Sequence, residues 1–404
     1  MNTKEIISNY TRKEFPESIG KYGNIFLIIG ALLSILAFFV DSERATYSSL
    51  IGFMFLISIG MGAMFFIALE YITGVVWSVP FRRITEFMTN LLWIAPIFAI
   101  PTLLNILYGG HMYHWVHPGE DVILLAKSAY LNEAWFVVRT ASILIIVFIF
   151  KLYMISNSRK QDTDKDQKYT KRNIIASAPF LAVFAFGISI IAIDFMMSLE
   201  PHWFSTIYGV YYFAGTFTAS IAVLTLFSVT LNEKGLLIDG ITTDHYYSLG
   251  GFMFAFTTFW MYIAFSQFML IWYANMPEET FWFIPRLEGA WGFATLSLLF
   301  IKFIIPFGLL INRNSKINPK RLKLASYWLI AAHFYDLYWL IYPTYSKQLS
   351  EHGNNFSIFN FWMEISIAVL IIGIILTVMK SSAKNVNLVP VGDPKLERGL
   401  NFHI

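Results

Sequence analysis

Ionisable side chains within long apolar runs are the residues of this sequence best suited to chemistry. Glu70 lies in GMGAMFFIALEYITGVVW, and His333 and Asp336 lie in AAHFYDLYW. A charge in a membrane helix is costly, so each of these residues is a functional hypothesis by default. Because His333 and Asp336 are three residues apart, a helix places them on one face. Such a pair fits a proton relay or a quinol-binding site, since quinol oxidation must release protons to a base.

Further charges fall at membrane depth when positions are counted along the chain. Glu70 and Lys302 fall in the inner half and His333 near the middle, while Arg139, Asp194, Glu200, Glu288, Asp336 and Glu364 fall nearer the outer face. The resulting candidates for proton conduction or a quinone site are Glu70, Arg139, Asp194, Glu200, Lys302, His333, Asp336 and Glu364. The alternative for each of them is a structural polar contact between packed helices.

Four charged residues in or near the predicted spans have specific expected partners. Glu70 is either a proton-carrying carboxyl or a structural group that forms an internal ion pair or a hydrogen bond to a neighbouring helix. Lys302 is either its partner or reaches towards the cytoplasm. Arg286 and Glu288 lie near the outer interface, and we expect them to pair locally.

The elements that must position these residues are transmembrane helices. The chain is 56% hydrophobic and 14% charged, whereas soluble domains carry roughly 25% charged residues. Apolar runs long enough to cross a hydrocarbon core of about 30 Å as helices number about ten. They cover residues 22–40, 50–77, 88–108, 134–156, 174–194, 205–231, 250–274, 288–311, 322–342 and 358–380. We therefore predict a single all-α transmembrane domain over residues 1–404.

The basic residues predict the orientation. The two terminal segments and the even-numbered connections hold 23 of the 29 Lys and Arg residues, and the other side holds five. Because cytoplasmic loops carry the excess of positive charge, both termini are expected in the cytoplasm. The most charged connection, 157–173, is expected to be a solvated loop that touches anionic lipid head groups.

Several classes of site are excluded by composition. With no cysteine, the chain has no thiolate-ligated iron–sulfur cluster and no cysteine nucleophile. Only His333 among the eight histidines lies well inside a span, which argues against a bis-histidine haem. His111, His114 and His117 fall in an outer loop, where a polar loop or a docking surface for another chain is favoured over a metal site. A net charge of +3 gives no case for nucleic-acid binding.

Three stretches resemble one family of membrane subunits. They are DFMMSLEPHWFSTIYGVY (194–211), FMFAFTTFWMYIAFSQFMLIWYANMPEET (252–280) and LASYWLIAAHFYDLYWLIYP (324–343). Together with the ten predicted spans, they are similar to the smaller polysulfide-reductase-like (NrfD-like) subunit of bacterial alternative complex III, a quinol:cytochrome c or quinol:acceptor oxidoreductase.

The resemblance implies a fold, a location and partners. It implies two four-helix bundles, from the second to fifth and the sixth to ninth helices, flanked by the first and tenth, in the bacterial inner membrane. The implied partners are a larger NrfD-like subunit, an iron–sulfur subunit, c-type cytochrome subunits and, as a further candidate, a terminal oxidase. Haem c and the iron–sulfur clusters would sit on those partners, so this chain binds no redox cofactor of its own beyond a contact with quinone or quinol.

Two other functions remain open from the sequence. A secondary transporter would show interrupted helices at matching places in two halves, and Pro96, Pro101 and Pro306 interrupt predicted spans. A purely structural anchor for peripheral redox subunits would tolerate neutralisation of Glu70, His333 or Asp336.

Overall fold

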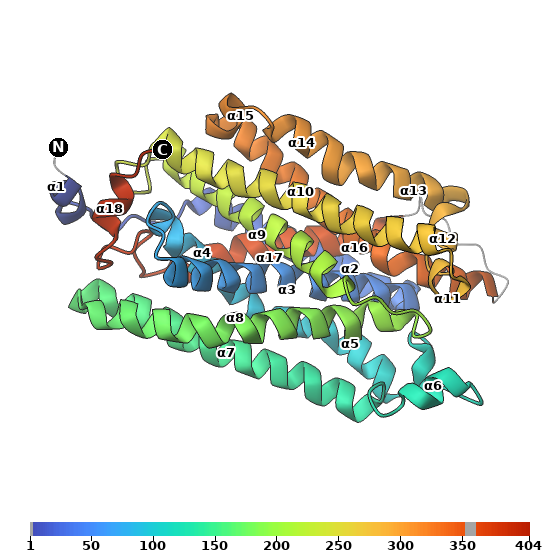
Figure 1. The fold of residues 1–404 in the computed structure, drawn as a ribbon. Coiled ribbons are helices and arrows are strands. Elements are labelled where there is room, and N and C mark those ends of the chain that lie inside the picture. The colour runs from blue at the N-terminus through green and yellow to red at the C-terminus, as the bar shows by residue number, and fades with distance from the viewer. Residues whose placement is uncertain (1–2, 352–360) are drawn as a thin grey trace.

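The fold is a long bundle of helices (Figure 1). The computed structural model describes residues 3–351 and 361–404. Within these residues, nine helical segments are long and apolar enough to cross a membrane, so the chain is an all-α, multi-pass membrane protein. They are α2 (Glu17–Val40), α3 (Ser42–Thr73), the interrupted segment Val79–Leu107, α7 (Glu133–Asp164), α8 with η4 (Gln167–Leu199), α9 (Tyr208–Glu233), α10 (Thr243–Ala274), the interrupted segment Gly289–Leu310 and α17 (Trp362–Ser382).

A tenth long helix, α16 (Pro319–Glu351), completes the predicted set. Its 33 residues would extend about 50 Å at 1.5 Å per residue, which exceeds the thickness of the hydrocarbon core. It is less apolar than the other nine because it carries His333, Asp336 and several tyrosines. His333 and Asp336 therefore lie on the least apolar of the long helices.

The interrupted segments and short helices complete the secondary structure. Val79–Leu107 consists of η1 (Val79–Phe81), α4 (Arg82–Met88), η2 (Thr89–Trp93) and α5 (Ala95–Leu107). Gly289–Leu310 consists of α13 (Gly289–Leu299), the π-helix η5 (Phe300–Ile304) and α14 (Ile305–Leu310). The short elements are α1 (Thr3–Ser8), η3 (His114–Val116), α6 (Val122–Lys127), η4 (Met197–Leu199), α11 (Pro277–Thr280), α12 (Ile284–Leu287), α15 (Arg313–Ile317) and α18 (Leu396–Leu400).

Helix contacts divide the long helices into two groups and a flanking pair. In the first bundle, α3 contacts α4, η2, α5 and α8, and α7 packs on α8. In the second bundle, α9 contacts α10 and α16, and α16 contacts α13 and α14. The flanking helices α2 and α17 pack along each other, and α3 joins the bundles by packing on α9.

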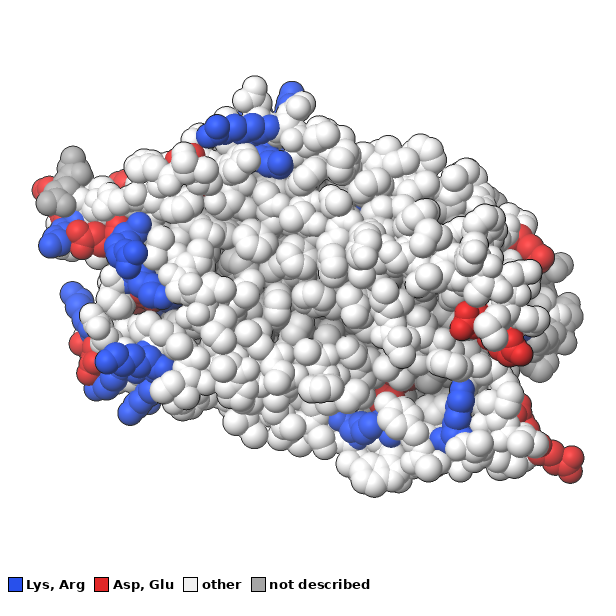
Figure 2. All heavy atoms as spheres, viewed as in Figure 1, with Lys and Arg blue, Asp and Glu red and all other residues white. Residues whose placement is uncertain are grey.

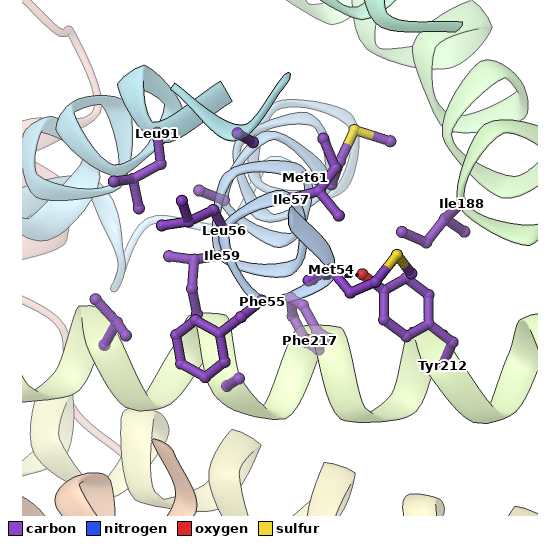
Figure 3. Close-up of a cluster of buried hydrophobic side chains, with 14 of the residues drawn as sticks. Met54, Phe55, Leu56, Ile57, Ile59, Met61, Leu91, Ile188, Tyr212 and Phe217 are labelled. Carbon is purple, nitrogen blue, oxygen red and sulfur yellow. Dashed lines mark hydrogen bonds between the residues drawn. The ribbon is translucent and has the colours of Figure 1, made fainter. Parts of the chain in front are cut away.

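Helix α3 is the central element of the molecule. In its most apolar window 94% of the residues are buried, against 22% for α2. Figure 3 shows its side chains radiating in all directions, towards Leu91 on η2, Ile188 on α8, and Tyr212 and Phe217 on α9. A helix that is apolar around its whole circumference is expected at such a buried position.

One predicted connection is corrected by the structure, and one predicted span is described only in part. The segment 157–173 is not a loop, because α7 continues to Asp164 and α8 begins at Gln167. The turn between them is only two residues long, with Lys165 left-handed at φ 53° and the Asp166 side chain capping α8 at the Lys168 amide. The predicted span 358–380 corresponds to α17, and its residues 358–360 lie outside the described residues.

Charges gather at the two ends of the molecule. In Figure 2, Lys and Arg side chains cluster at the end that carries α18 and both chain termini, and a broad uncharged band crosses the middle. This is the distribution that membrane proteins show at their cytoplasmic end. The termini share one end, as an even number of crossings requires.

Candidate functional site: an intramembrane lysine–aspartate–histidine cluster

The π-helix η5 places Lys302 inside the second bundle. Pro306 follows four residues later and has no N–H to donate to the Lys302 carbonyl, so the regular α-helical ladder is interrupted here. The chain forms a π-helix over Phe300–Ile304, a distortion that is frequent at functional sites. Lys302 is only 2% exposed.

The Lys302 ammonium group forms an ion pair with Asp336 on α16. His333 lies one turn before Asp336, and its Nδ1 is 3.5 Å from Lys302 Nζ. Their side chains face the same way because they are three residues apart on one helix. We call these three residues the lysine–aspartate–histidine cluster. Each of them is 2% exposed or less, so the cluster is enclosed by protein.

Hydroxyl groups extend the cluster into the first bundle. His333 Nε2 lies 3.0 Å from Ser58 Oγ on α3, and Ser58 Oγ is 2.9 Å from Tyr212 Oη on α9. On the other side, Tyr211 donates to Asp336 Oδ1 at 2.6 Å. The polar chain therefore runs across the junction of the two bundles and includes residues of α3, α9, η5 and α16.

Close packing holds the cluster together. A Cβ atom on Gly215 would approach both His333 Nδ1 and Lys302 Nζ to 3.1 Å, so the missing side chain lets α9 come near. The Trp260 ring lies 4.7 Å from Lys302 Nζ, in a cation–π contact, and the Phe55 ring is 5.6 Å from His333. These aromatic rings shield the charges from the bilayer.

This arrangement can exchange protons. The ion pair becomes a neutral amine and a carboxylic acid if one proton moves between its members, and burial disfavours charges in any case. The imidazole has a second nitrogen for proton transfer, and the neighbouring hydroxyls can donate and accept. The cluster therefore has the parts of a proton relay.

Lys302 and Glu70 do not pair, contrary to one of the two sequence expectations for them. Glu70, near the C-terminal end of α3, pairs with Arg82 on α4, with Oε1 2.9 Å from Nη2. Arg82 also pairs with Asp393 of the C-terminal segment. Lys302 meets Asp336 at the level of Ser58, half-way along α3. Both expectations for Lys302, a pair with Glu70 and a side chain that reaches the cytoplasm, are therefore wrong.

A second set of buried charges adjoins Glu70 and was not predicted from the sequence. Arg83 pairs with Glu86 and with Asp162, and Ser158 donates to Glu86 at 2.5 Å. The only sequence signal for this set is the pair of adjacent arginines after Pro80, followed by Glu86 three residues after the second arginine. We call the buried ion pairs formed by Arg82, Arg83, Glu70, Glu86, Asp162 and Asp393 the inner ion-pair network.

The remaining predicted residues lie apart from the cluster, near the outer end. Asp194 accepts from Arg139 Nε at 2.8 Å and from the Tyr130 hydroxyl at 3.0 Å. Glu364 accepts from Arg44 twice, at 2.9 and 3.2 Å. Glu200 lies 3.6 Å from Lys347. Each of these carboxylates has a partner nearby, so these residues connect neighbouring segments of the chain.

The prediction that Arg286 pairs with Glu288 is wrong, because the described residues form no ion pair between them. Arg286 is 2% exposed and donates to the carbonyls of Trp282 and Leu340, at 2.7 and 3.1 Å. Its guanidinium carbon lies 3.5 Å from the centre of the Trp282 ring. Burial lowers the pKa of Arg286 to about 10, because its charge is removed from water. Backbone carbonyls and an aromatic face replace the expected carboxylate.

Lys151 is a buried charge within a spanning helix that was not among the candidate residues. It falls inside the predicted span 134–156, and the structure places it in α7, where it is 2% exposed. Its Nζ has no hydrogen-bond partner within the described part of the chain and sits 4.7 Å from the Trp93 ring. The apolar residues on both sides, FIFKLYMI, were the available signal.

The outer histidines do not gather into a metal site. His117 Nε2 contacts the Gly109 carbonyl at 2.8 Å, and His114 contacts Gln348 at 3.3 Å. Among residues 3–351 and 361–404, no group of three or more His, Asp or Glu side chains is placed to hold a metal ion.

Neither a protein-family model nor a curated protein matches this sequence. The argument for function therefore rests on the fold and on the lysine–aspartate–histidine cluster.

Proposed function

We propose that this chain is a membrane subunit of a respiratory quinol oxidoreductase in the bacterial inner membrane, and that its lysine–aspartate–histidine cluster conducts protons. The observation that carries the proposal is the fully buried contact among Lys302, Asp336 and His333, connected by hydroxyl groups to both bundles. Intramembrane ionisable residues of this kind mark proton relays in pumps and transporters. The resemblance to the smaller NrfD-like subunit of alternative complex III agrees with this role.

In this proposal the redox groups belong to partner chains. A larger NrfD-like subunit, an iron–sulfur subunit and c-type cytochromes would carry out electron transfer, and a terminal oxidase is a further candidate partner. The role of this chain is to accept protons released by quinol oxidation or to carry protons across the bilayer. Tyr211, at 2.6 Å from Asp336, offers the first hydroxyl on the outer side, and Ser58, at 3.0 Å from His333, offers the next group towards α3.

The test measures protons and electrons together. The complex containing Lys302→Met or Asp336→Asn is reconstituted into vesicles, and the ratio of protons translocated to electrons transferred is measured during quinol oxidation. We expect this ratio to fall while quinol oxidation continues. The matched control is Lys323→Met, which removes a lysine from an ion pair with Glu233 that is partly exposed to water. An unchanged ratio in both cluster variants would exclude proton conduction through this site.

Membership of a complex is tested separately. The chain is purified in mild detergent with an affinity tag, and the preparation is examined by mass spectrometry and by a reduced-minus-oxidised spectrum. Copurifying c-type haem and an iron–sulfur chain are expected. A colourless preparation that is homogeneous and stable alone would favour a secondary transporter.

One structural feature favours the transporter as the second candidate. Two spans are interrupted, by η2 (Thr89–Trp93) in the first bundle and by η5 (Phe300–Ile304) in the second. However, η2 lies in the second segment of its bundle and η5 in the third, so the interruptions do not match as inverted or parallel repeats require. Uptake of a solute by vesicles containing the chain alone would support this candidate.

A further inference from the structure

A polar hollow lies where the span Gly289–Leu310 ends and α16 begins. It has a volume of about 490 Å³. All of its lining side chains carry N–H donors: they are Asn312, Arg313, Asn314, Asn318 and Arg321. In Figure 2, Lys and Arg side chains gather over this part of the molecule, around α15, beside the uncharged band. The hollow therefore lies at the level of the lipid head groups, just beyond the hydrocarbon core.

The chain around the hollow is strongly basic. Residues 311–324 hold five basic side chains and no acidic one: Arg313, Lys316, Lys320, Arg321 and Lys323. Acidic residues at the adjoining helix ends have other partners, since Glu233 on α9 pairs with Lys323 and Asp244 on α10 lies 3.5 Å from His403. Within residues 3–351 and 361–404, Lys323 alone of the five basic residues forms an ion pair. The charge at the hollow is therefore available to an anion from outside the chain.

Contacts with neighbouring side chains hold the hollow in shape. Both basic residues of α15 lie over the Tyr247 ring of α10, with Arg313 Cζ 5.5 Å and Lys316 Nζ 5.7 Å from its centre. Arg321 at the start of α16 donates from Nη1 to Ser315 Oγ at 2.8 Å. These contacts keep the two arginines on opposite sides of the turn between α15 and α16, so the site needs little rearrangement to bind.

Apolar side chains continue from the hollow along the membrane-facing surface. Ile311 directly precedes Asn312 and is 49% exposed, and Leu324, one turn after Arg321 on α16, is 52% exposed. An amphiphile with its polar group in the hollow would lay its acyl chains on these residues. A small soluble anion would make no contact with them.

We propose that the hollow binds the head group of an anionic phospholipid, with the phosphate between Arg313 and Arg321. Guanidinium groups bind phosphate through paired N–H donors. Asn318 accepts from the amides of Lys320 and Arg321 through Oδ1, which leaves its side-chain NH2 group to donate to further head-group oxygens. Basic pockets beside membrane helices are typical sites for such lipids.

The bound lipid would connect the two elements that carry the lysine–aspartate–histidine cluster. Arg313 follows α14, which continues from the π-helix that holds Lys302, and Arg321 belongs to α16, which carries Asp336. The site itself is separate from the cluster, so it stands or falls independently of proton conduction.

The experiment is hydrogen–deuterium exchange on the full chain with its copurifying partners, in lipid nanodiscs. One set contains phosphatidylcholine alone, and the other contains equal parts of phosphatidylcholine and phosphatidylglycerol. We expect peptides covering residues 311–324 to exchange about tenfold more slowly with phosphatidylglycerol, because a ligand that binds only the ordered segment stabilises it. Equal exchange in the two sets would overturn the proposal. So would equal slowing by inorganic phosphate in phosphatidylcholine alone, which would assign the hollow to a soluble anion.

Variants separate this site from general attraction to a charged membrane. Arg313→Gln combined with Arg321→Gln should abolish the slowing. Asn314→Asp should do the same, because it changes the shape of the lining very little and adds a negative charge that repels phosphate. It also keeps the test valid if the double variant does not fold.

The matched control removes two exposed arginines from α7 and α8, as Arg159→Gln combined with Arg172→Gln. This control lowers the net charge equally and should preserve the slowing at residues 311–324. Slowing that persists in Asn314→Asp, or that disappears equally in the control, would show that the hollow does not select the lipid.

Discussion

The two four-helix bundles each bury a lysine on their third spanning segment, and the two lysines have different surroundings. Lys151 in the first bundle and Lys302 in the second are both 2% exposed. Lys302 has a carboxylate and an imidazole within reach, whereas Lys151 faces only the Trp93 ring, with no hydrogen-bond partner for its Nζ among the described residues. Burial alone therefore does not mark a site; a charge becomes chemically useful when groups that exchange protons surround it.

The bundles also differ in where their ion pairs lie. The inner ion-pair network of the first bundle lies at the end that carries both chain termini. It ties α4 to the C-terminal segment through Asp393 and to α7 through Asp162. The cluster of the second bundle lies half-way along α3 and reaches that helix through Ser58. We conclude that the first bundle fixes the end of the fold that carries the termini, while the second provides the polar centre.

The largest expected effect is the loss of stability when one member of the Lys302–Asp336 ion pair is replaced. Either Lys302→Met or Asp336→Leu leaves one buried charge uncompensated, which typically costs 3–5 kcal/mol, so we expect a loss of about that size in the free energy of unfolding. The double variant should recover most of it, because apolar side chains replace the whole pair. Chemical unfolding in detergent measures both. Single variants as stable as the parent protein would show that the pair is not charged.

The next effect tests the inner ion-pair network. Arg82→Gln removes the partner of both Glu70 and Asp393 and should cost about 3 kcal/mol or more, since two buried carboxylates lose their counter-charge. The C-terminal segment should then exchange its amide hydrogens faster than in the parent protein. Arg398→Gln, on the exposed side of the same segment, is the control. Equal exchange rates in both variants would show that Asp393 does not hold the segment in place.

Local sequence patterns predicted much of the fold and part of the lysine–aspartate–histidine cluster. Long apolar runs predicted the spanning helices, and the three-residue spacing predicted that His333 and Asp336 share a face. It could not predict the partner of Lys302, because contact between η5 and α16 depends on tertiary packing, and chain direction alone placed Lys302 nearer Glu70. Lys151 was missed for a different reason: it lies in the last third of the predicted span 134–156, and hydropathy does not show whether a lysine near the end of a span is buried or reaches towards water.

A smaller effect of opposite sign is expected at Lys151. Lys151→Met replaces a buried ammonium group, which has no acceptor in the described residues, with an apolar side chain of similar length. Because no carboxylate is left behind, the free energy of unfolding should stay constant or rise by about 1 kcal/mol. The same unfolding assay compares it with Lys302→Met. A loss as large as that of Lys302→Met would remove the difference between the two bundles and point to a partner outside this chain.

The smallest effect lies at the outer ends, where a loop of the first bundle meets the entry to the second. Asp121 caps α6 by accepting from the amides of Ile123 and Leu124, and its carboxylate also contacts His202 Nε2 at 2.6 Å. The hydrogen bond to His202 is the main reason that the pKa of Asp121 lies below its usual value.

A lowered pKa in the folded state fixes the direction of the pH dependence at Asp121. The carboxylate contributes stability above its unfolded pKa of about 4, and that contribution is lost as the pH falls through the lower folded value. We therefore expect the exchange protection of the Ile123 and Leu124 amides to be steady near neutral pH and to decrease in acid. Asp121→Asn should flatten this dependence, whereas Glu120→Gln, on the neighbouring residue, should preserve it. A profile that Asp121→Asn leaves unchanged would show that α6 is held by packing of Leu124 alone, and the contact with His202 would then contribute nothing to joining the bundles at this end.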